Sequence, residues 1–173
     1  MQTNPRVVVA VASIQILAIA LWAGGLVTLG AVVAPIVFHN VPAPTSADAM
    51  TLVFARFDRV MIACGAIALV AEATLALRAG KVARLDVVRM VALVAAVGLS
   101  ITIAAWLTPG IAGLHEGGAV RGSGVAGLEL ERLHKLAEAL AKAELAFLLL
   151  VAVLSIGKVS RAARQGDRDA ADT

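Results

Sequence analysis

The sequence is poor in aromatic and charged residues. Among 173 residues there is no tyrosine, there are two tryptophans and four phenylalanines, and only 16% of the chain is charged. A soluble domain usually has about 25% charged and about 45–50% apolar residues, whereas 60% of this chain is hydrophobic. So short a chain has too little polar sequence to cover its long uncharged runs in water. These deficits exclude a soluble enzyme or nucleic-acid binder of the usual kind.

Cysteine is nearly absent as well. The single cysteine, Cys64, lies inside an apolar run, so it forms no intramolecular disulfide and gives no information about the redox compartment. The net charge is +3, but the basic residues lie at the ends of apolar runs and are not interleaved with aromatics. That distribution is typical of membrane helices beside an anionic leaflet. We therefore expect the lipid bilayer, and no nucleic acid, as a partner.

Four apolar segments dominate the chain. They cover residues 7–38, 60–77, 87–107 and 136–157. About 20 helical residues cross a bilayer, so the fold class is predicted to be all-α, an integral membrane four-helix bundle in one domain, 1–157. The first segment is too long for a signal peptide, and at ~1.5 Å per residue it must tilt, project from the membrane or bend near Pro35. Thr108-Pro109-Gly110 is predicted to end the third.

A short interfacial helix is predicted between the first two spans. It starts at Thr45-Ser46-Ala47-Asp48 and carries an apolar stripe, Met50, Val53, Phe54 and Phe57, with Arg56, Asp58 and Arg59 on its other side. Two interpretations stay open: a linker that packs down the bundle, or a lid over a site. Trp22 and Trp106 are expected near the outer interface, which indole rings favour.

The basic residues predict the orientation. With four spans, both termini and the middle loop share one side, which carries nine of the fifteen basic residues: Arg6, Arg78, Lys81, Arg84, Arg89, Lys158, Arg161, Arg164 and Arg168. This bias favours a plasma (inner) membrane protein with both termini in the cytoplasm. The basic and polar tail, 158–173, is predicted to be disordered.

Glu72 is the first acid that a span would bury. It precedes Arg78 by six residues, which places it about 9 Å inside the second helix. Gln15 and Ser13 lie at a similar depth on the first helix and are candidate hydrogen-bond partners. A charge at the centre of a span costs about 2.5–3.5 kcal/mol on insertion scales, so it needs a reason. A structural polar contact and a proton- or cation-binding carboxylate both remain open.

Glu144 is the second such acid. The fourth helix carries two i,i+4 pairs, Glu131 with Lys135 and Glu138 with Lys142, which form an exposed charged stripe. Glu144 lies about 240° around the helix from Glu138, so it should face the interior of the bundle. Its candidate partners are Ser100, Thr102 and Thr28. Structural and functional roles are again both open.

The three histidines all fall on the predicted outer side. They are His39 after the first span, His115 after the third and His134 before the fourth. Because helix ends converge in a bundle, a copper or zinc site with Glu116 or Glu138 as a further ligand is one hypothesis. No two histidines have the spacing of metal ligands, so separate interfacial histidines are the alternative.

Several short motifs carry a family resemblance. They are Leu21-Trp22-Ala23-Gly24-Gly25, Ala34-Pro35-Ile36-Val37-Phe38, Phe54-Ala55-Arg56-Phe57, Thr108-Pro109 and Leu133-His134-Lys135-Leu136. In order and spacing they resemble the transmembrane protein 205-like family, a bacterial four-helix membrane domain of unknown function (4149). The resemblance runs over 7–157, implies a membrane fold without lending a reaction, and singles out Trp22, Gly25, Pro35, Phe38, Pro109 and His134. The Gly-rich stretch 117–127, and Lys142 with Glu144, depart from that pattern.

Two classes of function follow. The first is a binding, structural or accessory membrane component without enzymatic activity, as a monomer or a homo-oligomer. The second is a small transporter or copper-type metal-handling protein. The second draws on a weaker, motif-level likeness to the membrane domain of copper-resistance proteins, which share a Trp-x-Gly-Gly helix and histidines near helix ends. A transporter predicts buried acids facing a cavity, and a scaffold predicts acids that are hydrogen-bonded in a dry bundle.

Overall fold

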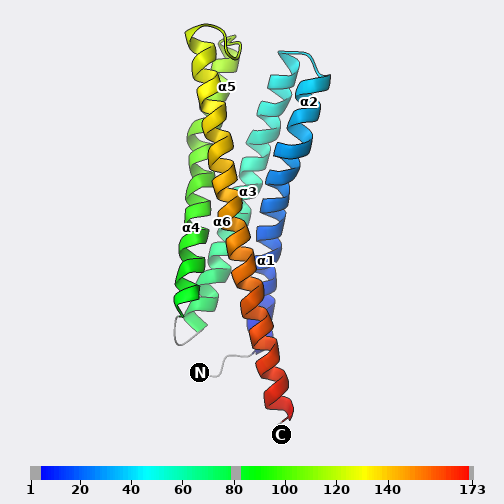
Figure 1. The fold of residues 1–173 in the computed structure, drawn as a ribbon, viewed down its shortest axis with the longest axis vertical. Coiled ribbons are helices and arrows are strands. Elements are labelled where there is room, and N and C mark those ends of the chain that lie inside the picture. Colours follow the sequence, from blue (N-terminus) through cyan, green and yellow to red (C-terminus); the bar gives the residue numbers. More distant parts are fainter. Residues whose placement is uncertain (1–4, 79–82, 172–173) are drawn as a thin grey trace.

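The chain folds into four long helical rods (Figure 1). The structure, a computed structural model, describes the backbone of residues 5–78 and 83–171 and the side chains of residues 6–78 and 83–160. The rods are α1 (Pro5–Val27), η1 (Thr28–Val33) and α2 (Ala34–Asn40); α3 (Thr45–Arg78); α4 (Arg84–Thr102), η2 (Ile103–Leu107) and α5 (Thr108–Glu116); and α6 (Gly124–Ala171). All four are long and apolar enough to cross a membrane. The predicted all-α four-helix bundle is confirmed.

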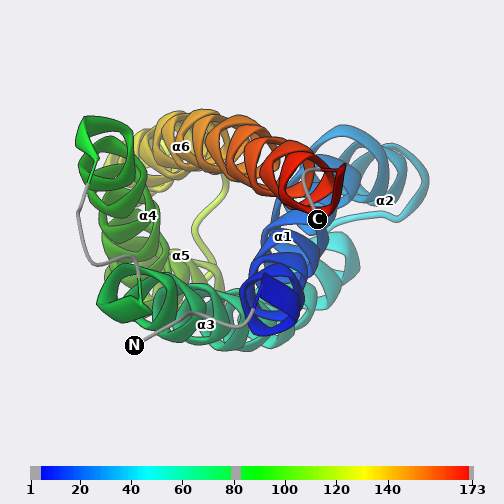
Figure 2. The ribbon, with the colours of Figure 1, turned by 90° about the horizontal axis from the view of Figure 1, so that it is seen from below.

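The rods form a closed ring in which each packs against two others. Viewed along its length, the bundle runs from α1 to α3, α4, α6 and back to α1 (Figure 2). Large side chains fill the centre, among them Trp22, Leu93 and Leu148, and alanines such as Ala68 and Ala96 lie between them. Small residues allow helices to approach closely, which is how packing stabilises helix association within a bilayer.

Two prolines interrupt the rods in the same way. Pro35 and Pro109 each lie near the start of an α-helix that directly follows a π-helical turn, η1 and η2. The amides of Ala34 and Thr108 there bond five residues back, to the carbonyls of Leu29 and Ile103. Proline lacks an amide hydrogen and clashes with the carbonyl four residues earlier, and the wider turn removes that conflict. The third rod therefore continues to Glu116, and the predicted end at Thr108-Pro109-Gly110 is wrong.

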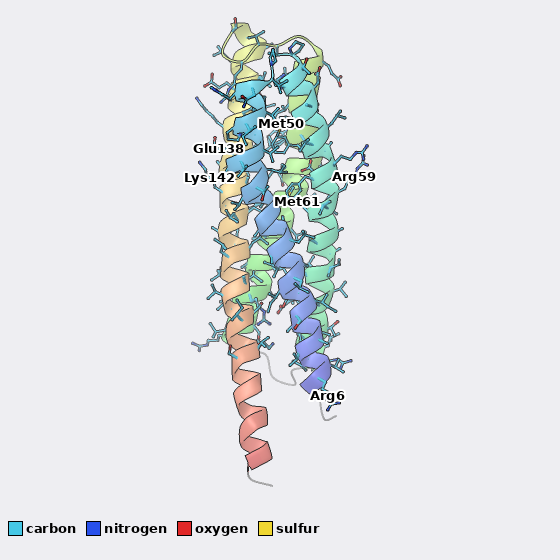
Figure 3. All side chains as sticks on the ribbon, turned by 90° about the vertical axis from the view of Figure 1, so that its right-hand side faces the viewer. Arg6, Met50, Arg59, Met61, Glu138 and Lys142 are labelled. Carbon is cyan, nitrogen blue, oxygen red and sulfur yellow. The ribbon has the colours of Figure 1, made fainter. Side chains whose placement is uncertain are left out.

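The predicted interfacial helix is not a separate element. Thr45–Arg78 is one continuous helix, α3. It holds no proline and a single glycine, Gly65, so nothing in its sequence breaks it. Met50 and Met61 are both buried and both point into the bundle, so the apolar stripe of the first turns continues into the span (Figure 3).

The ends of the first and last rods have two further features. Helix α6 runs through Ala171, where a disordered tail was expected from Lys158; the segment is rich in alanine and arginine, which favour helix. In the first rod, η1 and α2 contain no buried residue. Helix α2 packs on α3 and does not contact α6 (Figure 1). The contact between α1 and α6 therefore ends before the loops are reached.

Candidate functional site

Glu72 lies in a buried ion pair at the end of the bundle that holds the termini. The Glu72 carboxylate accepts hydrogen bonds from Arg89 Nε at 2.8 Å, from Arg89 Nη2 at 2.7 Å and from Gln15 Nε2 at 2.7 Å. The Arg89 and Glu72 side chains are only 3% and 1% exposed. A bidentate contact of this kind is among the strongest that arginine makes. Arg89 therefore compensates the negative charge of Glu72 within the protein.

This pair belongs to a cluster that joins all four rods. Arg89 Nη2 also lies 3.1 Å from Asp86 Oδ1, and Lys158 Nζ of α6 donates to the same oxygen at 2.9 Å. We call Gln15, Glu72, Asp86, Arg89 and Lys158 the ionic cluster. Its two acids and two bases balance in charge, which is what burial of ionised groups requires.

Glu144 lies in the middle of the bundle and is bonded differently. The Trp22 indole Nε1 donates to Glu144 Oε1 at 2.6 Å, and both side chains are fully buried, at 0% exposed. The second carboxyl oxygen, Oε2, is buried without a hydrogen-bond partner among the described residues. The partner is thus Trp22 and not Ser100, Thr102 or Thr28. The predicted interfacial position of Trp22 is wrong, because its ring packs in the core.

Asp58 is a third buried acid, nearer the loops. It is 6% exposed and accepts a hydrogen bond from Thr108 Oγ1 at 2.9 Å. The carboxyl groups of Asp58 and Glu144 interact electrostatically, and we call them the acid pair. The sequence predicts Asp58 on the polar side of an interfacial helix. In the continuous helix α3 the Asp58 side chain is buried, whereas its neighbour Arg59 points outward (Figure 3).

The histidines are only partly brought together. The rings of His115 and His134 lie 5.8 Å apart, edge to face. His134 Nδ1 donates to the Leu130 carbonyl at 2.8 Å. In the part of the chain that the structure describes, no group of three His, Cys, Asp or Glu residues could hold a metal ion. His39, at the end of α2, does not complete a ligand set with the pair.

The motif Trp22-Ala23-Gly24-Gly25 has a packing role. A side chain at Gly25 would overlap the ring of Phe57 on α3, and a side chain at Gly65 would meet the Trp22 ring at 3.4 Å. Two bulky rings thus lie across the α1–α3 interface, each against a glycine of the other helix. Pro35 and Pro109 mark the π turns, and Phe38 is half exposed on α2.

These contacts predict a difference between neighbouring glycines. Gly25→Ala should destabilise the bundle by about 1–3 kcal/mol, because the Phe57 ring must move. Gly24→Ala is the matched control: it meets nothing within 4 Å, and alanine favours helix by up to about 1 kcal/mol. Unfolding in mixed detergent micelles measures both, and Phe57→Leu should restore the Gly25→Ala variant. Equal effects at the two positions would contradict this packing role.

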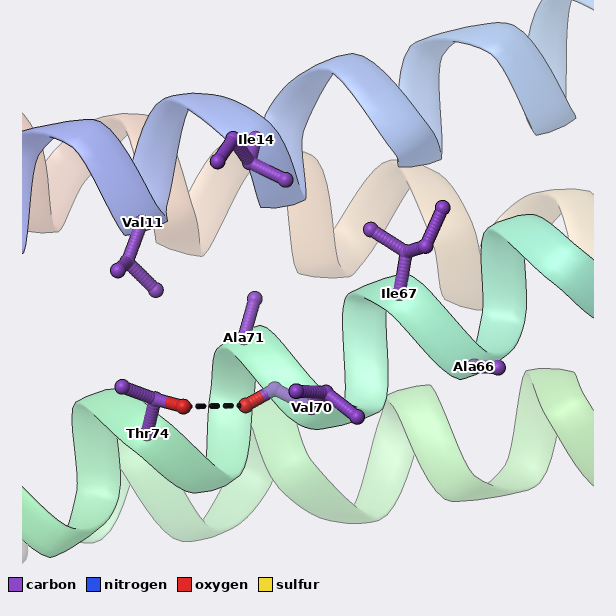
Figure 4. Close-up of a pocket in the computed structure, with 7 residues that line it drawn as sticks. All are labelled: Val11, Ile14, Ala66, Ile67, Val70, Ala71 and Thr74. Atoms are coloured by element: carbon purple, nitrogen blue, oxygen red, sulfur yellow. Dashed lines mark hydrogen bonds between the residues drawn. The ribbon is translucent and has the colours of Figure 1, made fainter.

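An apolar hollow lies between α1 and α3 on the outside of the bundle. It is lined by Val11, Ile14, Ala66, Ile67, Val70, Ala71 and Thr74, and the Thr74 hydroxyl is taken up by the Val70 carbonyl at 2.8 Å (Figure 4). Ile14, Ile67 and Val70 are largely exposed. Because its one hydroxyl group is already hydrogen-bonded, this apolar lining suits lipid chains.

The sequence interpretation missed Arg89 as a site residue, and Asp58, Asp86 and Lys158 with it. By sequence alone Arg89 is one of the basic residues near the loop between the second and third spans. Yet Glu72 lies six residues before Arg78, and Arg89 five residues after Arg84. In an antiparallel helical hairpin, residues equally far from the connecting loop reach the same depth. The similar distance of Glu72 and Arg89 from this loop is the sequence signal that could have predicted their ion pair.

Four apolar rods, packed around an apolar core that also buries several polar side chains, define a multi-pass helical membrane protein. The chain belongs to the family described as domain of unknown function DUF4149, whose model matches residues 17–120. The match ends after α5, so α6 with Glu144 and His134 lies outside it, and it is shorter than the resemblance over 7–157. No curated protein and no solved structure matches the chain.

Proposed function

We propose that the protein is a structural or accessory component of the plasma (inner) membrane that binds partners within the bilayer and catalyses no reaction. The observation that carries this proposal is the ionic cluster. It ties Gln15 of α1, Glu72 of α3, Arg89 of α4 and Lys158 of α6 into one set of contacts. A carrier must separate its helices during each cycle, and a closed, charge-balanced cluster opposes that movement.

The orientation belongs to the same proposal. The end of the bundle with the ionic cluster carries Arg6, Arg78, Arg84 and Lys158, and cytoplasmic ends of membrane helices carry an excess of lysine and arginine. This excess supports the proposal that both termini lie in the cytoplasm and the α5–α6 loop outside.

Site-specific photo-crosslinking in cells tests the proposal. One exposed residue on each rod would carry the crosslinker: Leu17, Val70, Val91 and Val153. An accessory or self-associating protein has a preferred face, so we expect one or two positions to give a discrete protein adduct while the others give lipid adducts. An adduct of twice the mass of the chain indicates a homo-oligomer. Lipid adducts alone at all four positions would contradict the proposal.

Flux measurements provide the second arm. Purified protein in sealed vesicles should pass neither protons nor Na⁺, K⁺, Cu⁺ or Zn²⁺ faster than empty vesicles do. A saturable flux that depends on the protein would overturn the structural role and favour the transporter hypothesis.

A further inference from the structure

The buried acids of the bundle differ in how their charge is compensated. Glu72 forms a salt bridge with Arg89, and Asp86 forms salt bridges with Arg89 and Lys158. Among the described residues, neither Asp58 nor Glu144 has a basic partner within salt-bridge distance. An ionised carboxylate without a partner is expensive to bury and usually neutralises instead. The acid pair therefore needs a positive ligand that the chain does not supply.

The geometry at Glu144 identifies the ligand. Oε1 is occupied by the Trp22 indole, and Oε2 is buried and unpartnered. A metal cation needs several oxygen or nitrogen ligands, and the described residues offer no group of three acids, histidines or cysteines. A proton needs a single oxygen. Glu144 Oε2 meets that requirement.

The charged groups around Glu144 are few. Helix α6 packs against α1, α4, η2 and α5, and the charged or titratable residues of these elements all lie near their ends: Arg6, Arg84, Asp86, Arg89, His115 and Glu116. From α3, the Asp58 carboxyl acts on Glu144. On α6 itself, Glu138 and Lys142 pair with each other on the outer surface (Figure 3).

The position of Glu144 favours access from the loop end. Fourteen residues, or roughly 21 Å of helix, separate it from Lys158, so the ionic cluster closes the opposite end. A hydrocarbon core of about 30 Å then places Glu144 about 9 Å below the loop-side boundary. Asp58 lies 20 residues, roughly 30 Å, from Arg78 and so close to that boundary. On this side α2 packs on α3 and does not contact α6.

We propose that Glu144 is a proton-binding site inside the bundle, and that it exchanges its proton with water at the loop end past Asp58. The proton adds to Oε2 and leaves from it, while Oε1 keeps the hydrogen bond from Trp22. No bond other than O–H forms or breaks. This site goes beyond the structural role and does not depend on it.

The composition of the chain supplies a reporter. There is no tyrosine, and Trp22 and Trp106 are the two tryptophans. Trp106→Phe removes a side chain that is 57% exposed and leaves Trp22, in contact with Glu144, as the sole emitter. The emission of this variant in lipid nanodiscs should titrate with pH in one step. Trp106→Phe/Glu144→Gln, whose amide oxygen still accepts from Trp22, should lose that step.

Two controls separate the site from the rest of the protein. Glu138→Gln removes the same charge from the outer face of α6 and should leave the step unchanged. Asp58→Asn should also retain the step, because equilibrium protonation of Glu144 does not depend on the route that the proton takes.

The infrared band of a protonated carboxyl group is the second measurement. The part of this band that appears in wild-type protein below the midpoint should be missing from Glu144→Gln. Trp22 emission that is independent of pH in the Trp106→Phe protein would overturn the proposal whether or not the glutamine variant folds. So would a step that survives Glu144→Gln.

Discussion

Replacing Arg89 with alanine should lower the free energy of unfolding by about 3–5 kcal/mol, because it leaves the Glu72 carboxylate buried without its base. Glu72 would keep only the hydrogen bond from Gln15. The variant would also lose a contact between two helices, because Arg89 connects α4 to α3 in the ionic cluster. Unfolding by a denaturing detergent, followed by the loss of helical signal, measures the effect.

Two variants show whether the cost comes from the unpaired charge. Arg132→Ala breaks an exposed pair with Glu129, whose side chains are 72% and 44% exposed, and should cost no more than about 1 kcal/mol. Replacing Glu72 and Arg89 together with leucine should recover most of the loss, because paired removal leaves no isolated charge. A double variant as unstable as Arg89→Ala would show that the cluster acts by shape and not by charge compensation.

The number of helical rods is predictable from the sequence because each membrane helix is a long uncharged apolar run. Four uncharged runs fixed the number of rods, and the absence of proline from α3 could have extended its start back to Thr45. The third rod was cut too short at Pro109 because proline usually ends a helix. Its effect here is absorbed by the π turn of η2, which depends on packing that the local sequence does not encode.

The candidate site was less readable, because it depends on which helices are neighbours. The burial of Glu144 follows from its angle on α6 relative to the paired stripe, which is a property of one helix. Its bond with Trp22 does not, since it requires α1 to lie beside α6. Asp58 was misplaced for a related reason: its side of the helix faces inward only once α3 is known to be continuous.

The family match covers only part of the chemistry: Glu72 and Arg89 lie within it, whereas Glu144 on α6 does not. Gly25, Pro35 and Pro109 shape the first three rods, within the matched residues 17–120. Glu144 and Lys158 come from α6, outside that match. Trp22 is the residue that joins them, because its ring packs against Gly65 while its indole nitrogen binds Glu144.

Trp22→Ala should accordingly destabilise the bundle by about 3–5 kcal/mol, the usual cost of removing a large buried aromatic ring. Trp106→Ala is the matched control: its ring is 57% exposed, so the change should stay within about 0.5 kcal/mol. Trp22→Phe separates the two roles of the residue. It keeps most of the ring but removes the donor to Glu144, and should cost about 1–3 kcal/mol. That smaller cost should vanish in a Trp22→Phe/Glu144→Leu protein, which has no carboxyl group left to satisfy. Equal losses for Trp22→Ala and Trp106→Ala would mean that the α1–α6 contact is not held by this side chain.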